Sequence, residues 1–204
     1  MKKLLIFAAA MAACTTASAA GIGVRAGTTG IGADVAFNVL PTLDARVGYS
    51  ALKWGFDTDT SNARYDGDLK LSNLSTLVDF RPLGPLFRLT GGLIFNDNKF
   101  EAVGRPNAVA GSFNATVESG RSAAPYLGIG WGNVAGRGFN FYADLGVMFM
   151  GTPKASISAN CAGLSAGQCS ALQNEVAAEQ QRLQDEMKGF KYYPVMNLGF
   201  TIGF

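Results

Sequence analysis

The last 15 residues of the chain, Phe190 to Phe204, alternate between large apolar side chains and small or polar ones. Counting back from the end, one set of alternate positions holds Phe204, Ile202, Phe200, Leu198, Met196, Pro194 and Tyr192. The other set is mostly small or polar and includes Gly203, Thr201, Gly199 and Asn197. Because successive side chains of a strand point to opposite faces, the pattern predicts a β-strand with one apolar face. A strand with lipid on one side and a packed or wet interior on the other has this pattern.

Seven further runs show the same period of two, so the chain is predicted to contain eight strands. The earlier seven are Gly21–Gly27, Gly30–Val39, Leu43–Leu52, Asp68–Arg81, Leu86–Phe95, Ala124–Trp131 and Phe139–Met150. The fourth of these runs changes phase. Its Leu69 and Leu71 follow one face, whereas Leu74 follows the other. A slip of one residue near Ser72-Asn73 predicts a β-bulge at that point.

The connections between these runs alternate between short and long. Leu40–Thr42, Pro82–Pro85 and Gly132–Gly138 are short and turn-like, and the long, polar connections are Lys53–Gly67, Asn96–Ala123 and Gly151–Gly189. Only the first hairpin, at Thr28-Thr29, is short where a long connection is expected. Even-numbered barrels carry short turns on the periplasmic side, so both termini are expected to be periplasmic.

The fold class that follows is all-β: an eight-stranded antiparallel transmembrane β-barrel with one helix in its last long loop. A soluble sandwich or lipocalin-like barrel also has alternating strands, but its charged face points outward. The outward-facing positions of this chain carry almost no charge and many aromatics, which favours lipid over water outside the barrel. An open sheet is excluded at membrane depth, because its edges would leave hydrogen-bonding groups unpaired in lipid.

The inward-facing positions carry charged side chains of both signs. They are Arg25, Asp34, Asp44, Arg46, Asp79, Arg81, Arg88 and Asp144, four basic and four acidic. An eight-stranded barrel is just wide enough for side chains to fill it, and a charge inside it needs a partner. We therefore expect these residues to fill the interior as a structural network, in preference to lining a conduction path. Tyr126 is expected opposite Asp144, which would accept its hydroxyl proton.

Turn geometry predicts which charged residues meet across neighbouring strands. If the hairpin strands align at their turns, Asp34 lies diagonal to both Arg25 and Arg46. Asp79 would lie directly opposite Arg88 on the next hairpin. Since directly opposed and diagonal side chains interact across strands, we expect an Arg25–Asp34–Arg46 cluster and an Asp79–Arg88 pair.

The N-terminal residues have the order of a secretory signal peptide. Two lysines precede the apolar run Leu4–Ala13, and small residues follow it. That run is shorter than the roughly 20 apolar residues that a transmembrane helix needs. We expect residues 1–19 to be removed by cleavage after Ala19, or alternatively after Ala20, which leaves 20–204 as one barrel domain. A lipoprotein signal at Cys14 is a further alternative.

Charge and missing residue types exclude several functions. Without the two N-terminal lysines the chain has 15 basic and 15 acidic residues, which argues against nucleic-acid binding. No histidine is present, which removes Ser-His-Asp catalysis and makes a zinc site improbable on two cysteines alone. The acidic segment Asp57–Asp68 fails the calcium-loop template, because Asn62 stands where the turn glycine belongs. We expect no enzymatic activity, no cofactor and no bound metal.

The last long connection, residues 151–189, contains two further predicted features. Cys161 and Cys169 are expected to form a disulfide in an oxidising compartment, with two free thiols in a mobile loop as the alternative. Residues 171–188 are predicted to form a helix, with Ser170 and Gln173 as its capping box. The apolar stripe of this helix would either pack over the barrel mouth as a lid or bind a partner.

Three segments carry a family resemblance: Tyr65–Leu71, Pro125–Gly132 and Asp144–Gly151. With them, the chain resembles the small eight-stranded outer-membrane proteins related to OmpA, OmpX and OmpW, and most closely a poorly characterised proteobacterial family. The resemblance implies a Gram-negative outer membrane, with outer-membrane lipid and the barrel-insertion machinery as partners, and implies no established activity. It also implies that Phe200, Ile202 and Phe204 form the C-terminal insertion signal.

These expectations combine into a functional hypothesis. The chain is expected to be an integral outer-membrane barrel with a largely filled interior and a structural or surface-interaction role in the cell envelope. Its long loops would contact a host or envelope partner. The alternative is a narrow, porin-like channel or a transporter that carries small molecules across the outer membrane.

Overall fold

The computed structural model describes residues 19–59, 63–84, 86–106 and 112–204. The predicted signal peptide lies outside these residues apart from Ala19, and so does Cys14. No helix within the described ranges is long and apolar enough to cross a membrane.

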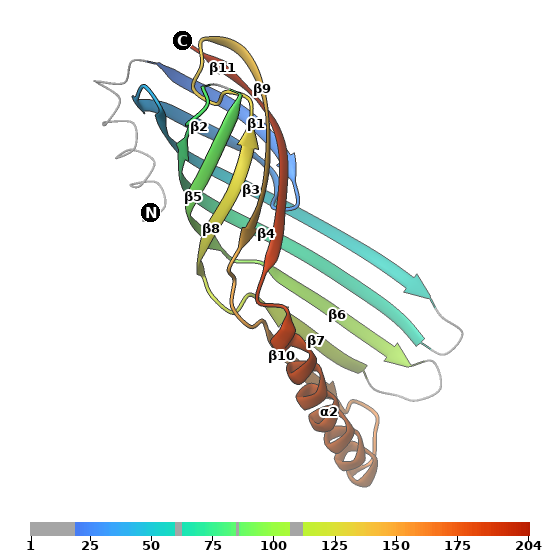
Figure 1. Ribbon diagram of the computed structural model, residues 1–204. Helices are drawn as coiled ribbons and strands as arrows, with labels where there is room; N and C mark the ends of the chain where they lie inside the picture. The colour runs from blue at the N-terminus through green and yellow to red at the C-terminus, as the bar shows by residue number, and fades with distance from the viewer. Residues whose placement is uncertain (1–18, 60–62, 85, 107–111) are drawn as a thin grey trace, which may run out of the picture.

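The described residues contain an 11-stranded antiparallel sheet (Figure 1). Its strands are β1 Ala20–Gly27, β2 Gly30–Leu40, β3 Leu43–Asp59, β4 Ala63–Phe80, β5 Phe87–Asn96, β6 Lys99–Pro106, β7 Ser112–Glu118, β8 Ala123–Trp131, β9 Gly138–Met148, β10 Lys154–Asn160 and β11 Tyr193–Gly203. Eight of them close into a ring in the order β1, β2, β3, β4, β5, β8, β9, β11 and back to β1. The predicted eight-stranded antiparallel barrel is therefore confirmed.

The ring closes where the two ends of the chain meet. β11 pairs with β1 in continuous register, from Gly21 opposite Gly203 to Gly27 opposite Asn197. Ala20 and Phe204 then exchange two backbone hydrogen bonds, at 3.0 and 3.2 Å. The C-terminal run is thus the last strand of the barrel and leaves no free edge at the seam.

Side chains alternate between the two faces of the ring as the sequence predicted. On β11, Phe200, Ile202 and Phe204 are 46%, 64% and 69% exposed, whereas the intervening Val195 and Thr201 are each 1% exposed. The exterior is therefore the apolar face, and the polar positions are buried inside. This inverts the arrangement of a soluble barrel, in which the apolar face is buried.

β3 and β4 continue beyond the ring and carry a further part of the same sheet on one side of it (Figure 1). Residues 73–80 of β4 pair with β5, and residues 63–70 pair with β6. β7 and then β10 add to β6. We call the far ends of β3 and β4, together with β6, β7 and β10, the extension.

The extension corrects the prediction of three long polar loops. The connections predicted at Lys53–Gly67, Asn96–Ala123 and Gly151–Gly189 contain most of its strands. Their polar composition resembles that of loops because one whole face of the extension is charged or polar. The other face is apolar, and it includes the stacked rings of Phe56 and Phe100, whose centroids are 6.1 Å apart.

The bulge predicted at Ser72-Asn73 is wrong. β3 and β4 stay in unbroken register from one end of their hairpin to the other. Leu71 is buried because the inner face of β4 becomes apolar near the mouth of the barrel, without any change of phase. What changes at this height is the partner of β4, from β5 to β6.

The helix in the last connection starts earlier than predicted. It comprises α2, Ala166–Glu186, and the 3-10 turn η2, Met187–Gly189. Its capping box is formed by Ser165 and Gln168, so the predicted cap at Ser170 is wrong. Both serines precede a glutamine by three residues, and spacing alone does not distinguish them.

The helix lies along β10, at the far edge of the extension from β3, and does not cover the barrel mouth as the lid prediction required (Figure 1). The side-chain carbonyls of Gln184 and Gln180 accept hydrogen bonds from the backbone N–H groups of Ala155 and Ile157, at 3.0 and 3.4 Å. α2 therefore provides hydrogen-bond acceptors for backbone N–H groups on the outer edge of β10. This prevents that edge from pairing with a strand of another chain.

Candidate functional site

Four charged side chains meet at the centre of the barrel, and we call them the charge quartet. They are Arg46 of β3, Asp79 of β4, Arg88 of β5 and Asp144 of β9. Each stands at an inward position of its strand, and none is more than 5% exposed. The alternation of the strands thus brings together residues that are up to 98 positions apart in the chain.

The quartet is a closed ring of ion pairs with alternating sign. Arg46 contacts Asp79 at 3.1 Å and Asp144 at 2.7 Å. Arg88 contacts the same two carboxylates, at 3.4 Å and 2.6 Å. The hydroxyl of Thr90 also donates to Asp79 at 2.5 Å. Each charge therefore has two partners of opposite sign, which a charge removed from water needs.

Tyr142 connects the quartet to a second ion pair. The guanidinium groups of Arg46 and Arg88 each lie 5.4 Å from the centroid of its ring. Its hydroxyl donates a hydrogen bond to Asp34, which forms an ion pair with Arg25 at 3.0 Å. A cation over an aromatic face is favourable, especially where water is excluded.

Glycines on the inner wall make room for these large side chains. A Cβ at Gly130 would lie 2.5 Å from Arg88 and 2.7 Å from Asp144. A Cβ at Gly199 would overlap the ring of Tyr142. Glycine within strands of this barrel therefore marks close approach of an interior side chain.

Both ends of the interior are occupied as well. At the end with the termini, the β8–β9 turn folds inward, and Val134 and Ala135 are 0% and 3% exposed beside Tyr142. Towards the extension, the amide of Asn73 donates to the Thr29 carbonyl at 3.0 Å, in a polar layer across the mouth.

Arg81 and Asp44 form a separate pair near the short turns. Their ion-pair distance is 2.8 Å, and Asn38 donates to the same carboxylate at 2.9 Å. The structure therefore gives every one of the eight predicted interior charges a partner of opposite sign, although several partners differ from those predicted.

The predicted Asp79–Arg88 ion pair is confirmed at 3.4 Å, although its register differs, and the predicted Arg46–Asp34 contact is wrong. Asp79 lies opposite Thr90 instead of Arg88, since the turn after β4 shifts the pairing by two residues. The two charges still meet, but diagonally. Arg46 was expected to join Asp34 and instead contacts the two quartet aspartates, because its long side chain crosses the interior.

Tyr126 was also misplaced. It lies opposite Met148, whereas Asp144 lies opposite Gly130, so the predicted hydrogen bond between Tyr126 and Asp144 is absent. The Tyr126 hydroxyl is buried with no hydrogen-bond partner among the described residues. The tyrosine that does bond to an aspartate is Tyr142, and the inward phase of β9 could have identified it.

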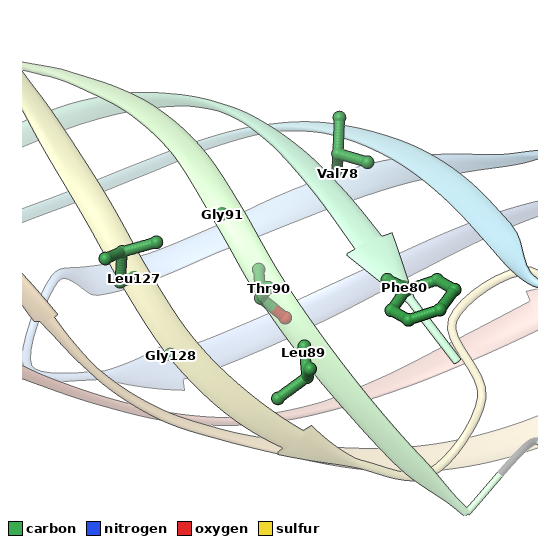
Figure 2. A pocket seen from close by; sticks show the side chains of 7 residues that line it. All are labelled: Val78, Phe80, Leu89, Thr90, Gly91, Leu127 and Gly128. Carbon is green, nitrogen blue, oxygen red and sulfur yellow. The ribbon is translucent and has the colours of Figure 1, made fainter. Parts of the chain in front are cut away.

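The outer wall carries a shallow apolar groove of about 650 Å³ (Figure 2). It is lined by Val78, Phe80, Leu89, Leu127 and two glycines, and its single polar side chain is Thr90. Because the Thr90 hydroxyl donates inward to Asp79, the groove offers only apolar contacts. It has no set of groups that would orient a polar substrate.

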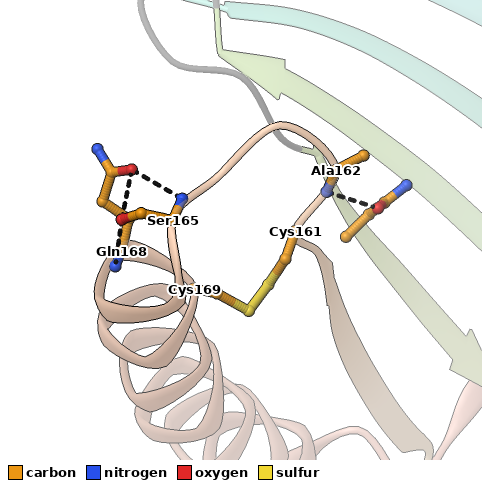
Figure 3. Close-up of a disulfide and its surroundings, with 6 residues drawn as sticks. Cys161, Ala162, Ser165, Gln168 and Cys169 are labelled. Atoms are coloured by element: carbon orange, nitrogen blue, oxygen red, sulfur yellow. Dashed lines mark hydrogen bonds between the residues drawn. A yellow bond between two sulfur atoms is a disulfide. The ribbon is translucent and has the colours of Figure 1, made fainter.

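The extension carries one covalent link. Cys161 and Cys169 form a disulfide between the end of β10 and the first turn of α2, beside the capping box (Figure 3). The link ties the start of the helix to the strand that it covers. Within the described residues, no group of three or more cysteine or acidic side chains could hold a metal ion.

Two solved structures share this fold. The crystal structure of Acinetobacter baumannii CarO2 matches with a TM-score of 0.65 and 18% sequence identity, over 93% of this chain and 100% of that one. The crystal structure of Acinetobacter baumannii CarO matches with a TM-score of 0.64 and 21% identity, over 90% and 97% of the two chains. The sequence matches no protein-family model and no curated protein. At these identities the likeness extends to the fold alone.

Proposed function

We propose that the chain is an integral outer-membrane β-barrel whose interior is closed by side chains, with a structural or surface-interaction role. The apolar exterior and polar interior of the ring support membrane insertion. The fold shared with two CarO barrels of a Gram-negative bacterium supports the outer membrane as its location. The finer relationship to OmpA, OmpX and OmpW remains a prediction.

The observation that carries the closed interior is the charge quartet. Its four side chains cross the barrel from four different strands and neutralise one another. A permeating ion would have to separate these pairs, and breaking a buried pair costs several kcal/mol. The inward-folded β8–β9 turn adds a second obstruction at the end with the termini.

Planar-bilayer recording tests the closed interior. The folded protein should insert without giving steady single-channel currents. The double variant R46A/R88A removes both guanidinium groups of the quartet, and it should conduct if the quartet, and not the inward-folded β8–β9 turn, is what closes the interior. Steady currents from the unmodified protein would contradict the proposal and support the alternative of a narrow channel or transporter.

That alternative has one observation in its favour. The end of the barrel with the termini is closed by a turn, which is not held in the ring of strands. A movement of residues 132–138 would uncover that end, although the quartet would still cross the centre. Intermittent currents in the recording above would therefore require both the turn and the quartet to open, and they would support this alternative.

The proposed orientation places the extension outside the cell and both termini in the periplasm. Cysteine substitutions at Lys154 and Arg137 test it, since both side chains are exposed and lie on opposite sides of the ring, in the extension and in the β8–β9 turn. A membrane-impermeant maleimide should label the Lys154→Cys variant on whole cells and should leave Arg137→Cys unlabelled until the cells are broken. The reverse result would invert the orientation.

A further inference from the structure

A row of lysines crosses the outer face of the extension where it leaves the barrel. Lys53 of β3 lies directly opposite Lys70 of β4, which lies directly opposite Lys99 of β6. The row faces outward, because it continues the alternation in which Tyr49 is exposed and Ser50 is buried. Like charges directly opposite each other in a sheet are destabilising, so anions close to the row would stabilise it.

Two glutamates supply part of the negative charge. Glu101 accepts from Lys70, and Glu118 contacts Lys99 at 2.6 Å. The hydrogen bond and charge of Lys70 lower the pKa of the Glu101 carboxyl. All four side chains in these pairs are 39% to 44% exposed, so a further anion can reach the lysines.

The distance between the row of lysines and the edge of the apolar exterior indicates which anion would lie beside the row. The hydroxyls of Tyr49 and Ser72 bond to each other at 3.1 Å on the outer surface, where the apolar exterior ends. Lys53 and Lys70 lie two residues beyond the Ala51–Ser72 pair, which is about 7 Å along a strand and about 5 Å along the normal for a strand tilted by about 45°. The headgroup region of a bilayer is roughly 5–7 Å thick on each side.

We propose that Lys53 and Lys70, with Lys99 beside them, bind the phosphate group of an anionic lipid in the bilayer around the barrel. The inference rests on the proposed function, because a barrel in a bilayer brings headgroups to this height. A phosphate group has several acceptor oxygens, so one group can bridge two ammonium groups. Its charge would also remove the repulsion between the opposed lysines.

Native mass spectrometry tests the proposal by counting lipids that stay on the extracted barrel. The protein is reconstituted into vesicles of phosphatidylcholine with a minor share of phosphatidic acid and is then extracted in mild detergent. The unmodified protein should retain phosphatidic acid in preference to phosphatidylcholine. The K53Q/K70Q variant should bind it about thirtyfold more weakly, since each lysine near a charged bilayer surface contributes roughly fivefold.

The matched control is R182Q/K188Q, which removes two exposed basic side chains near the end of the helix, outside the row of lysines. It should retain phosphatidic acid like the unmodified protein. Equal retention by K53Q/K70Q and the unmodified protein would overturn the proposal. The proposal would also be overturned if inorganic phosphate without lipid raised the melting temperature of the extracted protein as much as phosphatidic acid does. The site would then recognise free phosphate.

Failure of the inference and failure of the proposed function give different results. A protein that does not insert into the vesicles refutes the membrane barrel itself. A protein that inserts, shows the gel mobility of a folded barrel and retains no phosphatidic acid refutes only the lysine site.

Discussion

Removing one member of the charge quartet should destabilise the barrel far more than removing an exposed charge. In R88M, Asp79 and Asp144 keep only Arg46 as an arginine partner, at 3.1 and 2.7 Å. Two buried carboxylates then share one guanidinium. Because breaking a buried pair leaves an uncompensated charge, we expect a loss of about 3–5 kcal/mol in the free energy of unfolding. D144N should cost a similar amount, because it leaves two guanidinium groups with one carboxylate.

The double variant R88M/D144N should cost less than the sum of the two single variants. It removes one charge of each sign and leaves Arg46 with Asp79, a pair held by contacts of 3.1 and 3.2 Å. Side chains in one buried network typically couple by about 0.5–3 kcal/mol. We therefore expect the double-mutant cycle to show a coupling at the upper end of this range, about 3 kcal/mol, so that the double variant costs clearly less than the two single variants together.

Urea unfolding in lipid vesicles, followed by the fluorescence of Trp54 and Trp131, measures these differences. The control is R182M on the helix, where Arg182 forms ion pairs at 3.6 Å and its side chain is 71% exposed. That variant should change stability by less than about 1 kcal/mol. Single quartet variants no more destabilising than R182M, or strict additivity in the double variant, would refute the closed network of pairs.

Three further predictions follow from other parts of the molecule. Gly199→Val should destabilise folding by about 1–3 kcal/mol in the same urea assay, because the new side chain enters space that a tyrosine ring fills; Gly167→Ala, with nothing near its Cβ, should cause no loss. Cys169→Ser should leave barrel unfolding unchanged while protease cleaves the α2 segment faster, since the disulfide lies only in the extension; a less stable barrel, or unchanged cleavage, would contradict this. The Glu101 carboxyl should titrate below 4.5 in an NMR titration and return towards that value in Lys70→Gln, because Lys70 lowers its pKa. The stabilisation from this pair is present above the ordinary carboxyl pKa and is lost as the pH falls through the lowered one; an unshifted titration in the unmodified protein would contradict it.

The eight barrel strands could be predicted because all of them share one apolar exterior. Every outward position must be apolar, so the period of two extends over strands of about ten residues and stands out against other patterns. The extension has no such constraint, since water contacts its polar face. In residues 112–118 the polar and apolar side chains also alternate, yet the run is short and its polar members suggested a loop. Alternation counted over runs as short as seven residues predicts this strand.

The interior residues were predicted more completely than their partners. Alternation alone identifies which charges face inward, and all eight of those named are on the inner side. Partners depend on register, which each turn sets, and the turn around Gly84 moves the β4–β5 pairing by two residues. The reach of arginine adds to the difficulty, because Arg46 contacts Asp144 across the barrel without sharing a strand pair with it.

β4 belongs to the barrel wall and to the extension at the same time, with no break in its pairing to β3. The junction therefore has no hinge. A force applied at the far end of the extension would travel along this continuous strand pair into the wall that contains Asp79, and any turning of the extension would shear the wall with it. A partner that binds this surface would find it held at one fixed angle to the axis of the barrel.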